Sequence, residues 1–141
     1  MSASERIKGK RAENEFLKLL NKLFLDRGIE INLRRNLQQT QQGGADSLDL
    51  EGVAIEVKRH ERLSIAAWWR QALTQAGQDR LPVLAYRQSR KSWTVLVPSD
   101  RFKGEWEQQT FRRDTGLPPA WVMNAEAFVE ICIQEGIVGR D

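Results

Sequence analysis

The sequence predicts a mixed α/β fold, in which one β-sheet has helices on its faces. Three segments repeat apolar residues at intervals of three and four, which is typical of amphipathic helices. Five other segments either alternate apolar and polar residues or are short apolar runs. Both patterns are typical of strands. Their order is a helix, three strands, a helix, two strands and a final helix, which suits a sheet covered by helices. At 141 residues, we expect a single domain over residues 1–141.

The first helix is expected over residues 4–27. Its apolar stripe includes Phe16 and Leu20, and Gly28 follows as a natural helix end. Residues 29–35 then alternate apolar and polar side chains, which predicts a half-buried strand. Residues 36–45 are rich in glutamine and show no periodicity, so we interpret them as a surface loop.

Two short strands and a helix are expected next. The strands cover residues 47–50 and 52–58, and a tight turn near Gly52 joins them. The helix should begin after an N-cap at Ser64 and end at Gly77. This arrangement brings the second of the two strands directly before a helix.

The last elements are two strands and a helix. Residues 81–88 and 92–99 are apolar runs on either side of a basic turn. Residues 102–120 show only a weak pattern, and no element is predicted there. Asn124 should cap a final helix over residues 125–136, whose core face includes the single cysteine, Cys132.

The composition is that of a soluble globular protein. No apolar run approaches the ~20 residues that span a bilayer. The N-terminal segment is charged throughout and has no apolar stretch of the kind found in signal peptides. We therefore expect a cytoplasmic protein.

The basic residues are grouped along the chain. Lys and Arg number 22 against 19 Asp and Glu, which gives a formal charge of +3. Short basic clusters can neutralise successive phosphates of a nucleic acid, whereas isolated surface charges are simply solvated. The clusters lie at residues 8–11, 34–35, 58–62, 87–91 and 112–113.

Glu56 and Lys58 fall on one face of an expected strand, opposite to its core face. An exposed ion pair worth ~0–1 kcal/mol is the simplest interpretation. Asp49, in the preceding strand, can approach Glu56 across the hairpin, and neighbouring carboxylates repel unless a proton or a cation separates them. Mg²⁺ prefers oxygen ligands and takes one or two carboxylates, so these acids indicate a candidate metal site.

Glu13 is a third acid in an unusual place. It falls in line with Leu17, Leu20 and Phe24 on the apolar stripe of the first helix. Such an acid either reaches water at the edge of the stripe or faces a cation, which is the same metal or the ammonium of Lys58.

Three motifs in this order, KGKRAENEFLKLL, SLDL and AIEVK, resemble the archaeal Holliday junction resolvases and related phage nucleases of the PD-(D/E)XK superfamily. The similarity covers residues 8–86, and LPVLAYR also looks like a later core strand of that family. The resemblance implies a restriction-endonuclease-like core of order αβββαβ, here with a further strand and a C-terminal helix. Leu48 stands where the superfamily has its name-giving proline, which takes no part in the chemistry.

The resemblance also assigns roles. By this resemblance, Glu13 corresponds to the glutamate on the family's first helix. Asp49 and Glu56 correspond to its metal ligands, and Lys58 corresponds to its catalytic lysine. Together with the backbone carbonyl of Val57, the two ligands would bind Mg²⁺, for which Mn²⁺ can substitute. Asp46 competes with Asp49 for the aspartate role, but it precedes the expected strand.

The activity implied by the resemblance is that of a Mg²⁺-dependent endodeoxyribonuclease, most specifically a Holliday junction resolvase in DNA recombination and repair. Resolvases of that family act as homodimers, so a homodimer is expected by analogy, with Trp68, Trp106 and Trp121 as interface candidates. The expected setting is the nucleoid or the cytoplasm of a phage-infected host. Candidate phosphate contacts are Lys8, Lys10, Arg11, Arg34, Arg35, Arg59 and Arg62.

Three alternatives compete with this hypothesis. The first is a restriction-type or repair nuclease that acts on linear, flap or single-stranded DNA with the same residues. The second is a DNA-binding module that retains the fold without turnover, which the complete set of Glu13, Asp49, Glu56 and Lys58 disfavours. The third is a purely structural origin for all four placements.

Overall fold

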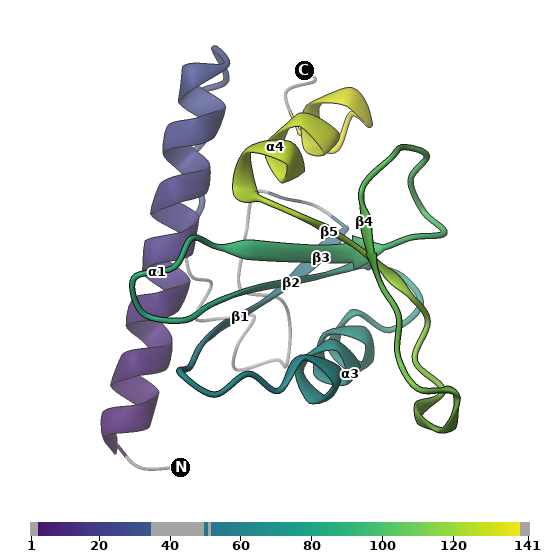
Figure 1. Ribbon diagram of the computed structural model, residues 1–141. Coiled ribbons are helices and arrows are strands. Elements are labelled where there is room, and N and C mark those ends of the chain that lie inside the picture. Colours follow the sequence, from purple (N-terminus) through teal and green to yellow (C-terminus); the bar gives the residue numbers. More distant parts are fainter. Residues whose placement is uncertain (1–2, 35–49, 51, 139–141) are drawn as a thin grey trace.

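The computed structural model describes residues 3–34, 50 and 52–138. Within these ranges, a mixed five-stranded sheet is flanked by three helices, which confirms the predicted α/β class and is consistent with a restriction-endonuclease-like core (Figure 1). The elements are α1 (Ala3–Asp26), β1 (Val53–Arg59), α3 (Ile65–Ala76), β2 (Leu81–Arg87), β3 (Thr94–Pro98), β4 (Glu107–Gln109), the 3₁₀ turn η1 (Arg113–Thr115), β5 (Ala120–Met123) and α4 (Ala125–Gln134).

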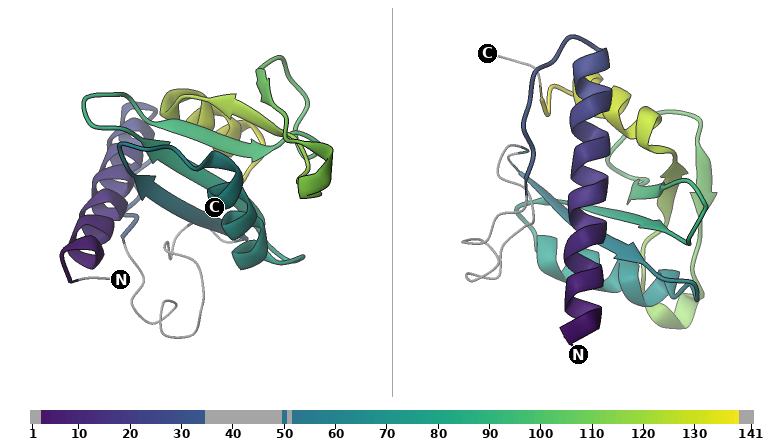
Figure 2. Two further views of the ribbon diagram at one scale, coloured as in Figure 1. Left: turned by 60° about the horizontal axis from the view of Figure 1, so that its bottom comes forward. Right: turned by 90° about the vertical axis from the view of Figure 1, so that its left-hand side faces the viewer.

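The strand order of the sheet is β1-β2-β3-β5-β4. β1 and β2 are parallel, with Lys58 opposite Tyr86, and the other pairs are antiparallel. α3 and α4 lie on opposite sides of the sheet, and α1 runs across it beside the ends of β1 and β2 (Figures 1 and 2). A ligand of such a sheet is expected beyond the carboxyl ends of the parallel strands.

The alternation of β1 divides the core into two sides. Val53, Ile55 and Val57 are on the core face, as the alternation predicted, and they pack with residues of α1 and α4. Ala54 packs instead against Ala76 of α3. The face of β1 that includes Glu56 and Lys58 is therefore the α3 face.

α1 forms because its apolar residues make one continuous stripe, and Phe16, Leu20 and Phe24 of this stripe are fully buried. The helix ends at Asp26, and the turn that follows closes at Gly28, whose φ of 79° suits glycine. There the amide of Ile29 donates to the carbonyl of Phe24 at 2.9 Å, and the amide of Gly28 donates to that of Leu25 at 2.9 Å. These bonds satisfy carbonyls that the helix would otherwise leave open.

The strand predicted over residues 29–35 is wrong for residues 29–34, which form no strand; Arg35 lies outside the described residues. The alternation did predict burial, since Leu33 is in the core and Ile29 and Ile31 pack against it. The side-chain amide of Asn21 takes the role of a neighbouring strand. It donates to the carbonyl of Leu33 at 3.0 Å and accepts from its amide at 2.7 Å.

Replacing Asn21 by alanine should therefore lower the free energy of unfolding by about 2 kcal/mol, since two hydrogen bonds to the backbone of Leu33 are lost. Urea unfolding measures this change. Asn14→Ala is the matched control, because Asn14 is exposed on the same helix. Equal stability of the two variants would contradict the role of Asn21.

The predicted strands at residues 81–88 and 92–99 are confirmed as β2 and β3, but β4 and β5 were not predicted. β4 consists of Glu107, Gln108 and Gln109, which have little strand propensity, so its pairing with β5 decides its structure. Of the two expected caps, Asn124 accepts a hydrogen bond from the amide of Ala127 at 2.8 Å. Ser64 occupies the predicted N-cap position of α3, but its hydroxyl makes no cap hydrogen bond.

Cys132 is fully buried on α4, as predicted for a small core residue. Burial raises the pKa of its thiol to about 12. The thiol is therefore protonated at neutral pH and unsuited to nucleophilic or metal chemistry. None of the helices in the described ranges has the length and apolarity needed to cross a membrane.

Candidate active site

Glu56 and Lys58 are neighbours on the α3 face of β1, as the strand period predicted. Nζ of Lys58 lies 3.5 Å from Oε1 of Glu56. The side chains are only 12% exposed for Glu56 and 21% for Lys58. The two side chains therefore form a largely buried ion pair, because both charges have lost most of their water. The simplest interpretation of the sequence, an exposed and solvated ion pair, does not apply.

The protein environment acts on Glu56 in two opposing ways. Burial raises the pKa of its carboxyl group above the ordinary value of 4.5, because the charged form has lost water. The charge of Lys58 and its hydrogen bond lower that pKa, but burial is the larger effect. The lysine therefore compensates the acid only in part, and a further cation would favour the ionised form.

Glu13 lies on the stripe of α1 that packs on the sheet. Its side chain is half-buried between buried neighbours such as Ala12 and Leu17, and its Oε2 atom is buried. α1 packs on the side of the sheet opposite to Glu56 and Lys58. β1 is the edge strand of the described sheet. To approach Glu56 and Lys58 as predicted, the side chain of Glu13 would have to extend past the outer edge of β1.

The predicted metal ligands are only partly within the described residues. Glu56 and Val57 lie on β1, whereas Asp49 and its competitor Asp46 lie outside the described ranges. Residues of those ranges form no group of three or more Asp, Glu, His or Cys side chains placed to bind one ion. A buried carboxylate with a raised pKa is nevertheless a suitable donor for a hard cation, which removes the cost of its charge.

The turn that leads into β1 is present. The amide of Val53 donates to the carbonyl of Leu50 at 3.2 Å, and Gly52 between them has a φ of 75°. Leu50 itself is buried in the core on the side of α1. The residue before it in the sequence is Asp49, so the predicted second acid directly precedes a residue whose position is fixed by the core.

Residues 4–115 match the family model described as "phage putative PDDEXK endonuclease". The chain belongs to this endonuclease family. The matched range includes α1 from its second residue, the whole of β1, the three predicted acids and the lysine. No curated protein and no solved structure gives a significant match.

The predicted phosphate contacts of this endonuclease divide into two groups. The candidates on α1 and in the described loops are exposed, whereas Arg59 already forms an ion pair within the protein. Nη1 of Arg59 lies 3.4 Å from Oε2 of Glu15, and its side chain is only 30% exposed. Arg35 lies outside the described residues. The exposed candidates are Lys8, Lys10, Arg11, Arg34 and Arg62.

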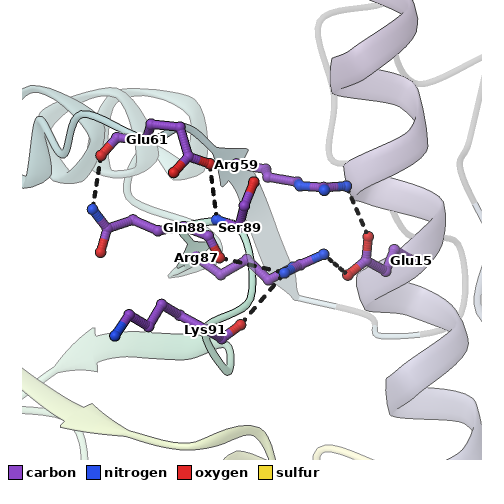
Figure 3. A network of polar contacts seen from close by, with 7 residues as sticks. All are labelled: Glu15, Arg59, Glu61, Arg87, Gln88, Ser89 and Lys91. Carbon is purple, nitrogen blue, oxygen red and sulfur yellow. Dashed lines mark hydrogen bonds and ion pairs between the residues drawn. The ribbon is translucent and has the colours of Figure 1, made fainter.

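Glu15 joins α1 to both parallel strands of the endonuclease (Figure 3). Its second oxygen, Oε1, lies 2.6 Å from Nη2 of Arg87 at the end of β2. The guanidinium of Arg87 also lies 5.5 Å from the ring centre of Trp93, and it is mostly buried. One carboxylate therefore ties the last residues of β1 and β2 to the helix that includes Glu13.

Arg87 belongs to one of the basic clusters of the sequence, but no pattern predicted that Glu15 binds it. Each is an ordinary charged residue at the edge of an element, and the two lie far apart in the sequence, which hides their contact. The usable signal was their place. Arg59 directly follows the strand expected over residues 52–58, Arg87 lies near the end of the strand expected over residues 81–88, and Glu15 is at the margin of the apolar stripe. Parallel pairing of the two strands brings these ends together.

Proposed function

We propose that the chain is a Mg²⁺-dependent DNA endonuclease that hydrolyses phosphodiester bonds, with four-way junctions as its preferred substrate. The observation that supports it most directly is the buried Glu56–Lys58 pair on the edge strand of the sheet. Membership of the endonuclease family supports DNA as the substrate class. The preference for junctions is supported by the resemblance of the three sequence motifs to those of resolvases.

In this proposal Glu56, Asp49 and the backbone carbonyl of Val57 bind Mg²⁺, or Mn²⁺ in its place. The ion would supply Lewis-acid chemistry, which polarises a phosphate oxygen and lowers the pKa of a water molecule. Glu56 is suited to this role because its carboxylate is buried and only partly compensated by Lys58. Cation binding then offsets a cost that the free protein bears.

Lys58 has the second role. Its ammonium is fixed beside Glu56 and is 21% exposed, so it can reach a phosphate placed over the edge of β1. There it would orient the attacking water and offset the negative charge that grows on the phosphate in the transition state. Glu13 would hold the ammonium or bind the ion through water.

A homodimer would place two such sites against two strands of one junction. The tryptophans predicted for its interface differ in exposure. Trp68 is buried, while Trp106 and Trp121 are half-buried and pack on each other at 5.8 Å between ring centres. Sedimentation of the protein alone and with a junction would test the dimer, and a single monomeric species under both conditions would exclude it.

The decisive experiment compares four end-labelled substrates in parallel: a four-way junction, a linear duplex, a flap and a single strand. Each is incubated with the protein in Mg²⁺, in Ca²⁺ and in EDTA, and the Glu56→Gln variant purified in the same way excludes contaminating nuclease. Preferred cleavage of the junction in Mg²⁺ is the expected result. Preferred cleavage of another substrate would favour the restriction-type or repair nuclease, and binding without cleavage would favour a silent DNA-binding module.

A further inference from the structure

The turn between β2 and β3 has an unusual backbone. Residues 88–91, which we call the basic turn, are closed by a hydrogen bond from the amide of Lys91 to the carbonyl of Gln88 at 3.1 Å. Arg90, the third residue of this turn, has a φ of 64°. Among the described residues it alone has a positive φ without being glycine. Glycine or asparagine is preferred at such a position, because a larger side chain strains the backbone there.

Contacts from outside hold the basic turn in place (Figure 3). The amide of Ser89 donates to Oε1 of Glu61 at 3.0 Å, and Nε2 of Gln88 donates to the backbone carbonyl of Glu61 at 2.7 Å. Arg87, which Glu15 binds, also donates to the carbonyl of Lys91 at 3.4 Å. The turn is thus fixed both to the loop after β1 and to α1, so its strained conformation is imposed by its surroundings.

Two side chains of the basic turn, those of Arg90 and Lys91, are cationic and exposed. Neither Arg90 nor Lys91 forms an ion pair with a carboxylate of the described residues, although Glu61 is close to the turn. Glu61 is occupied by the backbone of Ser89 instead. The positive charges of Lys8 and Arg59 act on Glu61, and Arg62, the next residue in the sequence, is exposed. Positive charge therefore predominates around the turn.

The place of the basic turn relates it to the candidate active site. It follows β2 directly, and β2 ends beside β1, with Arg59 opposite Arg87. Lys58 is the residue before Arg59, so the turn and the candidate catalytic lysine lie at the same end of the parallel pair. DNA whose phosphate approaches Lys58 would have neighbouring phosphates within the area of the turn.

We propose that the basic turn is a DNA-binding element of this endonuclease, in which Arg90 and Lys91 each contact a backbone phosphate beside the one that is cleaved. This inference rests on the proposed function. It explains why a strained position has an arginine: the side chain is needed for binding, while the backbone conformation alone would be easier for glycine. The contacts are with phosphates, so they add affinity without sequence preference.

The test is the Arg90→Gly variant, which removes the cation and relieves the strain together. The melting temperature should stay equal or rise, while affinity for a fluorescent duplex in EDTA falls about five- to tenfold at 0.1 M salt. The slope of log affinity against log salt should become smaller by about 0.9, and by about 1.8 when Lys91→Ser is added. A purely structural arginine would show no loss of salt dependence.

Two further variants keep the result unambiguous. Arg90→Asn tolerates the same backbone and should bind like Arg90→Gly, whereas Arg90→Lys keeps the charge and should retain most of the affinity. Arg101→Ala is the matched control, because Arg101 is an exposed arginine just after the far end of β3. It should leave affinity and slope unchanged.

The outcomes separate this inference from the proposed function. If Arg90→Gly binds DNA with wild-type affinity and salt slope while the wild-type protein cleaves DNA, the basic turn is not a DNA-binding element and the nuclease assignment stands. If the wild-type protein neither binds nor cleaves any DNA substrate, both are overturned. An equal loss for Arg101→Ala would show a general charge effect and would also overturn the inference.

Discussion

The Glu56→Gln variant should lose more than about 100-fold of the cleavage rate and yet be more stable than the wild-type protein in EDTA. Loss of an outer partner of a metal site already costs ~10–100-fold, and Glu56 is proposed as a direct ligand. Glutamine has nearly the same shape, so the buried position stays filled. What disappears is a negative charge on a side chain that is only 12% exposed.

The gain in stability follows from the direction of the pKa shift. The folded pKa of Glu56 lies above the ordinary value of 4.5, because burial disfavours the charge. Between these two pKa values the folded state binds more protons than the unfolded state, so stability falls as pH rises through this window. The full cost is present above this window, and glutamine does not incur it.

Thermal unfolding at pH 7.5 in EDTA and in Mg²⁺ measures both effects. The melting temperature of the wild-type protein should rise with Mg²⁺, because a ligand that binds only the folded state stabilises it. That of Glu56→Gln should be higher in EDTA and respond little to Mg²⁺. Glu105→Gln, at an exposed loop position, is the control and should change neither stability nor cleavage. Wild-type cleavage by Glu56→Gln would refute the metal role of this residue.

The adjacency of Glu56 and Lys58 depends only on the local geometry of one strand. A strand places every second side chain on one face, so the adjacency of Glu56 and Lys58 followed from the pattern of residues 52–58 alone. The same rule also predicted the burial of Leu33, but a pattern of burial contains no information about a strand partner. The amide of Asn21 supplied the hydrogen bonds that a neighbouring strand would have made.

Contacts between distant segments were beyond the sequence. Arg59 was predicted to contact phosphate as a member of the basic cluster at residues 58–62. The alternation of β1 turns it to the α1 side, where Glu15 binds it. β4 was missed because its strand state depends on pairing with β5 and not on its own residues. The positive φ of Arg90 could not be predicted either, since an arginine in a turn does not by itself indicate a strained backbone.

Replacing Lys58 by methionine should lower the cleavage rate by about 10²–10³-fold, since a fixed positive charge beside the reacting phosphate is lost. Methionine is also long and unbranched, so the half-buried position remains packed. Binding of DNA in EDTA should change far less than the rate, because other basic residues supply most phosphate contacts. Single-turnover cleavage and fluorescence anisotropy measure the two quantities separately.

The pH dependence of Lys58→Met gives a second, independent signature. Lys58 lowers the pKa of Glu56 by its charge and its hydrogen bond, so without it burial acts alone and the pKa of Glu56 rises further. Glu56 must be ionised to bind a cation, so the acidic limb of the pH–rate profile should move to higher pH. Lys58→Arg keeps the charge and should keep this limb in place even if its altered shape lowers the rate. Lys103→Met, at an exposed site, should match the wild-type profile throughout. An unshifted acidic limb in Lys58→Met would mean that the 3.5 Å pair does not control the ionisation of Glu56, and the role of Lys58 would then be confined to the phosphate.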